Sequence, residues 1–295
     1  MEAQLGMRDE GRGMREDLGL GVYACPSCQG DLTPVAAGLR CAGRQVRPPA
    51  AAGPCQLTYP LVDGIPDFIL GDSAQSPNIL LRHVGRMDRL ARVYESRWWY
   101  PLALTVYSGW RKTSLRELVR LVGEMVRTDG RLILDVACGP GTLGRRIVSP
   151  AQEVYGVDIS LGMLQFGQSY ARRDRLSNVH FARAQVEALP FRPATFDAAI
   201  CGGALHLFPD TVAALRQIAR TMQPGAPLAV TTFVAGDGGV LQFRRVREHI
   251  HAEHRMRIFE LPELQGYLAE AGFTGFAPQV FGSFVVFRAV RAPTA

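Results

Sequence analysis

One stretch decides the fold of this 295-residue chain: Leu132-Ile133-Leu134-Asp135-Val136-Ala137-Cys138-Gly139-Pro140-Gly141-Thr142. Its first half is an apolar run typical of a buried strand, and its second half is a glycine turn that opens a helix. At such a junction a ligand can approach both the backbone and the helix N-terminus. The stretch therefore predicts a nucleotide site, and Gly139, Gly141 and Gly144 also satisfy the G-x-G-x-x-G dinucleotide pattern.

The chain around this stretch alternates predicted strands with predicted helices. Strands are expected at 131–136, 153–159, 178–182, 196–201 and 227–233, and helices at 142–148, 162–174, 211–222 and 262–271. This alternation indicates a parallel sheet covered on both faces. Two last strands, at 275–279 and 283–291, have no helix between them, so they predict an antiparallel edge.

A second acidic residue strengthens the prediction of a nucleotide site. The strand after the glycine turn ends in Val157-Asp158-Ile159-Ser160. An acid about 20 residues beyond such a turn is suited to accept hydrogen bonds from both ribose hydroxyls. These motifs alone still allow a nicotinamide-dependent dehydrogenase, or glycines that serve only a tight turn between strand and helix.

Residues 131–291 resemble the class I S-adenosylmethionine-dependent methyltransferases, in particular the small-molecule branch with the ubiquinone and menaquinone methylases. Five segments carry the resemblance in the family's order: 134–141 (LDVACGPG), 156–160 (GVDIS), 187–191 (EALPF) with 195–197 (TFD), 204–210 (ALHLFPD) and 222–225 (MQPG). The resemblance implies a Rossmann-like α/β fold with a seven-stranded sheet and an antiparallel C-terminal edge. It also favours S-adenosylmethionine over a nicotinamide cofactor.

The same resemblance assigns the cofactor-binding residues. It places Asp135 beside the ammonium group of the methionine part, Gly139 and Gly141 beneath the cofactor, and Asp158 on the ribose. Gln185 stands where the family usually has an aspartate that contacts the adenine amino group, and its amide oxygen can still accept that hydrogen bond. The backbone N–H of the next residue is expected at the adenine edge. The remaining members of the predicted set are Val186, Ala137, Ile159 and Cys201, the last expected to be a small buried residue.

Two residues are candidates for the chemistry of methyl transfer. His206 follows the fourth predicted strand, at the sheet edge where ligands bind, and is expected to act as a base or an orienting group. A histidine that only packs this loop is an equally good interpretation. Tyr94 lies in a segment that resembles the family's lid over the cofactor. Nearby aromatic residues, including Trp98 and Trp99, could line an apolar substrate pocket or simply pack a helical cap.

Four cysteines mark a separate module before the catalytic domain. Cys25-Pro26-Ser27-Cys28 is typical of one half of a zinc knuckle, and Cys41 and Cys55 complete four thiols. The module resembles the short zinc ribbons found before bacterial methyltransferases and in the small activating partner of tRNA methylases. Here residues 42–54 separate the last two cysteines, so a loop inserted in the second knuckle is expected, with a metal-free module as the alternative. Four thiolates would make a structural Zn²⁺ site.

Composition limits the partners and the location. The net charge is +6, but the chain has a single lysine, Lys112, and no dense basic run with interleaved aromatic residues, so nucleic acid is an allowed but not a favoured partner. The sequence shows neither a secretory signal nor an apolar run long enough to span a membrane, so a cytoplasmic protein is expected. The oligomeric state is left open.

The expected organisation has four parts: a disordered tail at 1–20, the zinc-ribbon-like module at 21–72, a helical cap or lid at 73–127, and the methyltransferase domain at 128–295. The favoured function is methylation of a small hydrophobic or aromatic metabolite. The first alternative is base methylation of ribosomal or transfer RNA. The second is a protein of the same fold that binds the cofactor without transferring methyl groups.

Overall fold

The structure is a computed structural model that describes residues 20–43, 55–70, 98–109, 113–237, 239–254 and 256–293. Residues 1–19 of the expected tail and the expected lid residue Tyr94 lie outside these ranges. In the described part of the chain, no helix has both the length and the apolar character needed to span a bilayer.

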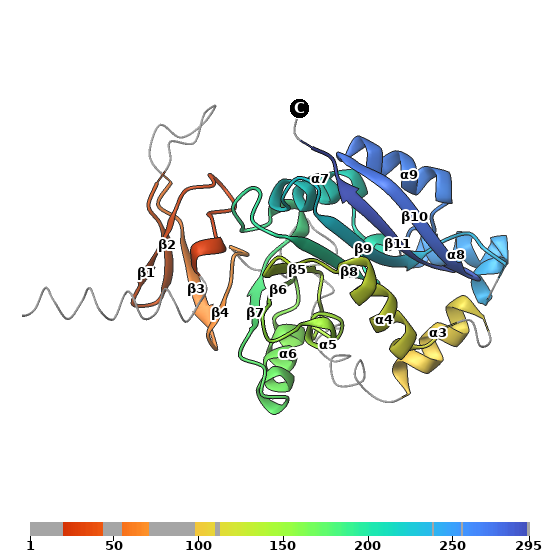
Figure 1. The fold of residues 1–295 in the computed structure, drawn as a ribbon, viewed down its shortest axis with the longest axis horizontal. Helices are drawn as coiled ribbons and strands as arrows, with labels where there is room; N and C mark the ends of the chain where they lie inside the picture. Colours follow the sequence, from red (N-terminus) through yellow and green to blue (C-terminus); the bar gives the residue numbers. More distant parts are fainter. Residues whose placement is uncertain are drawn as a thin grey trace, which may run out of the picture.

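A seven-stranded sheet forms the centre of the molecule (Figure 1). Its order is β10-β11-β9-β8-β5-β6-β7. Strands β5 to β9 run parallel, whereas β11 is antiparallel to both β9 and β10. The strands are β5 (Leu132–Val136), β6 (Glu153–Asp158), β7 (Val179–Arg183), β8 (Ala198–Gly202), β9 (Pro227–Phe233), β10 (Phe273–Phe281) and β11 (Phe284–Arg291). The predicted α/β sheet with an antiparallel C-terminal edge is confirmed.

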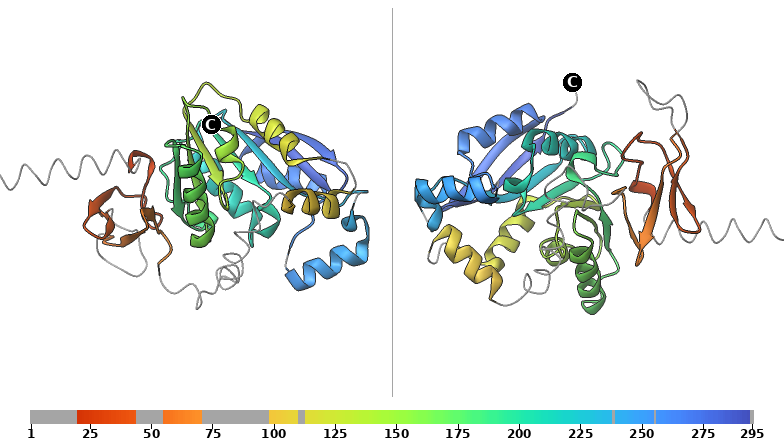
Figure 2. Two further views of the ribbon diagram at one scale, coloured as in Figure 1. Left: turned by 90° about the horizontal axis from the view of Figure 1, so that it is seen from below. Right: turned by 180° about the vertical axis from the view of Figure 1, so that it is seen from behind.

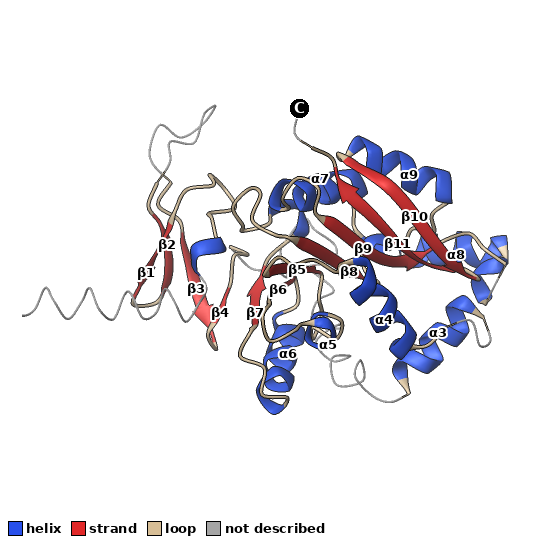
Figure 3. Ribbon diagram, in the orientation of Figure 1, coloured by secondary structure: helices blue, strands red, loops and turns tan. Residues whose placement is uncertain are grey.

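Helices cover both faces of this sheet (Figure 3). One layer holds α4 (Leu115–Met125), α5 (Gly144–Ile147) and α6 (Leu161–Arg173), and the other holds α7 (Thr211–Thr221) and α9 (Leu261–Glu270). The central strand β5 serves both layers, because Leu134 and Val136 join the core beneath α7 and α9 while Ile133 joins the core beneath α4. This division explains why the strand is apolar at nearly every position. The remaining helices are α3 (Trp99–Ser108), α8 (Arg244–His254) and the short turns η1 (Leu20–Val22), η3 (Val186–Ala188), η4 (Leu205–Leu207) and η5 (Val240–Gln242).

The cysteine-rich module is a small antiparallel sheet beside the β7 edge of the large one (Figure 2). Its strands are β1 (Leu32–Val35), β2 (Gly38–Cys41), β3 (Thr58–Val62) and β4 (Ile65–Pro66). The ring of Tyr23 is buried and stacks on Phe191 of the large domain with ring centroids 5.2 Å apart. Tyr155 and Phe68 also contact this ring, so the module and the large domain share one apolar core.

The segment predicted as a cap, 73–127, is described only from residue 98 onward with a gap at 110–112. Helix α4 packs against β9 and β11, and it therefore belongs to the layer that covers the sheet. Its N-terminus is fixed by Ser114, whose side chain accepts a hydrogen bond from the Glu117 N–H at 3.2 Å. Helix α3 contacts η5 instead, close to the carboxyl ends of the parallel strands.

Candidate functional site

The glycine turn after β5 is held by the acid that ends β6. The backbone N–H of Gly139 donates to Asp158 Oδ2 at 2.8 Å, and the N–H of Ser160 donates to Oδ1 at 2.8 Å. Gly139 has φ +55°, and a Cβ built there would meet no atom within 4 Å. The turn therefore presents open backbone to a ligand, next to a carboxylate that its neighbours already hold in place.

The acid of the first motif lies deeper. The side chain of Asp135 is buried and accepts a hydrogen bond from the Gly144 N–H at 3.1 Å, at the start of α5. Loss of hydration on burial raises the pKa of this carboxyl to about 7, although the Gly144 N–H opposes the shift. A cationic ligand group beside it would favour its ionised form.

One cavity of about 290 Å³ opens at the carboxyl ends of the parallel strands. It is lined by five of the predicted residues, namely Asp135, Ala137, Gly139, Asp158 and Ile159, together with His206. A smaller hollow of about 50 Å³ lies beside it and adds Gln185 and Val186 to the lining. Asp158 and Ile159 line both spaces, so the cavity at the glycine turn and the hollow beside Gln185 share a wall.

Two residues of the predicted cofactor set do not line either space. Cys201 is 1% exposed and packs in the apolar core. Gly141 has φ +71°, and a Cβ there would come within 3.0 Å of the Phe181 ring, so this glycine serves the turn and its packing. Conversely, Thr231 and the backbone of Gly202 and Gly203 line the cavity without having been predicted. These residues lie toward the carboxyl ends of β8 and β9, and this position could have predicted that they face the ligand site.

The far part of the cavity is apolar. Its lining residues there come from α3, α4, β9, β11 and the segment before α9, and they are Leu104, Leu115, Leu118, Phe233, Met256 and Phe284. Among the described residues, no arginine or lysine lines this space. A ligand that occupies it gains free energy from apolar contact rather than from ion pairing.

His206 lines the cavity next to the apolar residue Phe233. The centroids of the His206 and Phe233 rings are 4.7 Å apart, and Nδ1 is 3.3 Å from the hydroxyl oxygen of Thr232. The side chain is 5% exposed, and burial lowers the pKa of the imidazole to about 3. The ring is therefore neutral at physiological pH, and one nitrogen can accept a hydrogen bond.

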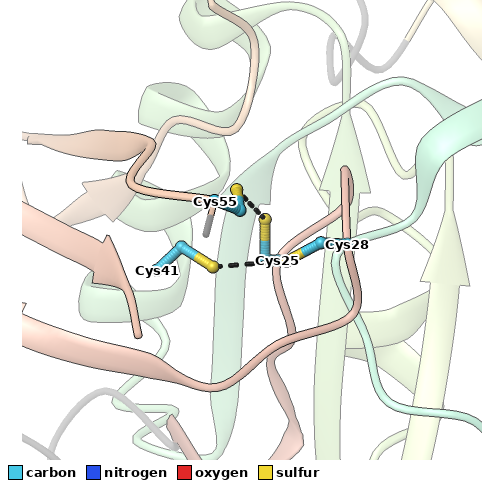
Figure 4. Close-up of side chains that lie close together, drawn as sticks. All are labelled: Cys25, Cys28, Cys41 and Cys55. Carbon is cyan, nitrogen blue, oxygen red and sulfur yellow. Dashed lines mark hydrogen bonds between the residues drawn. The ribbon is translucent and has the colours of Figure 1, made fainter. Parts of the chain in front are cut away.

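The four cysteines of the module converge although Cys41 and Cys55 are far apart in sequence (Figure 4). All four sulfur atoms lie within 4.8 Å of one another, with Cys28 and Cys41 3.4 Å apart and Cys25 and Cys55 3.8 Å apart. Zinc–sulfur bonds of about 2.3 Å in tetrahedral geometry separate the sulfur atoms by roughly 3.8 Å. The thiols therefore fit one tetrahedral metal ion, and they are too far apart for disulfides.

The fold and the site together define a class of protein. A parallel sheet with an antiparallel β10–β11 edge, a glycine turn after β5 and acids at the ends of β5 and β6 are the features of the Rossmann-like class I methyltransferases. Residues 133–225 match the family described as the methyltransferase domain. The chain thus contains a methyltransferase domain.

Known proteins agree with this assignment. The chain is 37% identical over 139 residues to a demethylmenaquinone methyltransferase of Corynebacterium kroppenstedtii, and the aligned part covers 45% of this chain and 55% of that protein. It is 27% identical over 210 residues to an uncharacterized chloroplastic methyltransferase of Arabidopsis thaliana, and this alignment covers 64% of this chain and 58% of the relative. It thus spans little more than half the length of these curated relatives. Haemonchus contortus phosphoethanolamine N-methyltransferase 2, solved with S-adenosyl-L-methionine, shares the fold with a TM-score of 0.54 at 14% identity, over 69% of this chain and 60% of that chain.

Proposed function

We propose that the protein transfers a methyl group from S-adenosylmethionine to a small, neutral, hydrophobic molecule such as a phenol or a quinol. The observation that carries the proposal is the continuous cavity, which passes from the glycine turn and Asp158 into an apolar chamber that no described arginine or lysine lines. The demethylmenaquinone methyltransferase relative supports a substrate of this kind.

The residues at the glycine turn fit the cofactor. With open space over Gly139, the Asp158 carboxylate would accept hydrogen bonds from the ribose hydroxyls, and Asp135 would pair with the ammonium group. Gln185 and Val186, which line the smaller hollow, would hold the adenine ring. When bound, the cofactor supplies an activated methyl group for in-line displacement, so alignment by the protein contributes most of the catalysis.

His206 orients the substrate in this proposal. With a pKa of about 3, its imidazole is a poor base for a phenol of pKa about 10, and full proton transfer before methyl transfer would cost roughly 10 kcal/mol. A neutral imidazole nitrogen can instead accept the substrate O–H as a hydrogen bond and hold the oxygen in line with the methyl group. Of the two roles considered for this residue, the geometry and the pKa favour orientation over general-base catalysis.

The cysteine module, in the same proposal, holds one structural Zn²⁺ through Cys25, Cys28, Cys41 and Cys55. Four thiolate ligands leave no position for a substrate or a water, so the ion supports the fold and takes no part in catalysis. Burial raises the pKa of Cys41 and Cys55, and metal binding to these thiols therefore releases protons.

Labelling with a radioactive methyl donor tests the function. Purified protein is incubated with tritiated S-adenosylmethionine and, in parallel, a panel of neutral phenols and quinols, a panel of carboxylated analogues, and total RNA. We expect label in the neutral apolar compounds and little in their carboxylated analogues, because a buried charge without a partner is costly. Label in RNA alone would overturn the substrate class. Tight cofactor binding without transfer to any fraction would indicate a protein that binds the cofactor but does not methylate.

A further inference from the structure

One of the contacts between the cysteine-rich module and the catalytic domain lies next to the predicted cofactor site. Asp67, just after β4, forms a parallel bridge with Arg183, the last residue of β7. The N–H of Phe68 donates to the Arg183 carbonyl at 2.8 Å, and Arg183 Nη1 pairs with Asp67 Oδ2 at 2.9 Å. The two side chains are only 9% and 12% exposed, so this ion pair is largely shielded from water.

The guanidinium of Arg183 has a second contact on the catalytic side. Its Nε donates to the carbonyl oxygen of Ile159 at 3.0 Å. The planar fork of an arginine can satisfy two acceptors in fixed directions at once, here a carboxylate of the module and a carbonyl of the cofactor loop. Ile159 directly follows Asp158 and lines both the main cavity and the smaller hollow.

The module also holds the side chain of this loop residue. Asp67 Oδ1 accepts a hydrogen bond from the Ile69 N–H at 3.0 Å, which fixes the chain after β4. Ile69 is buried and packs against Ile159 in a small cluster of its own. The module thus acts on Ile159 in two ways: directly through the side chain of Ile69, and indirectly through Asp67, which holds the arginine bonded to the Ile159 carbonyl.

We propose that Asp67 and Arg183 are positioning residues for the cofactor, through which the cysteine-rich module sets the shape of the Asp158–Ser160 loop. The inference rests on the proposed function, because it concerns the affinity for S-adenosylmethionine. In the intact pair the loop is ordered before the cofactor arrives, so binding does not have to supply that order. Removal of either partner leaves a shielded charge uncompensated. Loss of Arg183 also removes the donor to the Ile159 carbonyl, whereas loss of Asp67 removes the carboxylate that holds the guanidinium in place.

The variants Asp67→Asn and Arg183→Lys test the ion pair, and Ile69→Ala tests the packing contact without leaving a buried charge. The matched control is Asp31→Asn, which removes another ion pair between the module and the domain, Asp31 with Arg192 at 2.9 Å, at an exposed place away from the cavity. Titration calorimetry with S-adenosylhomocysteine measures Kd for the full-length zinc-loaded proteins. Thermal melts verify that each variant is folded at the temperature used.

We expect Asp67→Asn to weaken the binding of S-adenosylhomocysteine about tenfold, and Ile69→Ala about threefold, with Asp31→Asn within twofold of the wild type. Arg183→Lys keeps the charge but loses the two-way fork, and its Kd is expected between those of the wild type and Asp67→Asn. In steady-state assays the KM for S-adenosylmethionine rises accordingly while kcat changes less than twofold.

Two results would overturn the inference while the proposed function stands: unchanged Kd in the folded Asp67→Asn and Ile69→Ala variants, or an equal loss in Asp31→Asn, which would indicate general loosening of the module. A fall in kcat without a change in KM would also oppose a positioning role in cofactor binding. Failure of the wild-type protein to bind S-adenosylhomocysteine would refute the proposed function itself, and the inference with it.

Discussion

Substitution of Gly139 separates the cost of a strained turn from the cost of a blocked cofactor site. Gly139 has φ +55°, and an added Cβ would meet nothing within 4 Å in the protein. Gly139→Ala should therefore cost only the left-handed backbone penalty, about 1–2 kcal/mol of folding free energy. The new methyl group would occupy space that the cofactor needs, and overpacking of about 2 kcal/mol corresponds to a roughly thirtyfold rise in Kd for S-adenosylhomocysteine.

A matched glycine makes this prediction specific. Gly225 has φ +81°, also with nothing within 4 Å of a built Cβ, but it lies in the turn before β9 and outside both cavities. Gly225→Ala should lower the melting temperature by the same few degrees as Gly139→Ala and leave Kd unchanged, as measured by differential scanning fluorimetry and calorimetry. If Gly139→Ala bound S-adenosylhomocysteine as tightly as the wild type, the placement of the cofactor over this turn would be wrong.

Three further perturbations test the site. Because the pKa of Asp135 is raised to about 7, S-adenosylhomocysteine should bind about tenfold more weakly at pH 6 than at pH 8. At pH 6, binding should release close to one proton from Asp135, as measured by calorimetry in two buffers, and Asp135→Asn should abolish both effects. Because burial lowers the pKa of His206 from 6.5 to about 3, its neutral ring contributes stability that is complete above pH 6.5 and is lost as the pH falls toward 3. His206→Gln should flatten that part of the stability curve, lower kcat at least tenfold, and leave Kd for S-adenosylhomocysteine within twofold. An acid limb of kcat near pH 6.5 that disappears in His206→Gln would contradict the neutral imidazole. Plasma mass spectrometry should find one equivalent of zinc in Cys201→Ala, whose residue lies outside the cluster, and none in Cys28→Ala, which should also melt on the order of 10 °C lower. Absence of zinc from both proteins would contradict a metal site at the four thiols.

The sequence was sufficient to predict the sheet because each buried strand is a short apolar run, and these runs alternate with helical segments along the chain. Every predicted strand of the large sheet is present, with ends that differ by a few residues, since strands buried on both faces are apolar almost throughout. Helix ends were less accurate where the first turn is irregular. The helix predicted at 142–148 is reduced to α5 over Gly144–Ile147, because residues 139–143 remain in the turn that holds Asp158.

The site was predictable as far as it depends on strand ends and the glycine turn. Asp135, Gly139 and Asp158 follow that rule and line the cavity. Cys201, near the end of β8, is buried in the core as expected for a small apolar residue, and it does not line the cavity, although it was included in the predicted cofactor set. The contacts of Asp67 with Arg183 could not be foreseen, because 116 residues separate the partners and neither belongs to a recognisable motif.

The placement of the cysteine-rich sheet has a practical consequence for anyone who would trim the chain to its catalytic part. Strand β7 is the outermost strand of the large sheet on that side, and an uncovered outer strand with unpaired backbone groups is a template for self-association. Deletion of residues 1–70 would uncover this strand at Arg183 and remove the Tyr23 ring that packs on Tyr155 and Phe191. The shortened protein should therefore form insoluble aggregates during expression, whereas the intact chain should purify as a dispersed species.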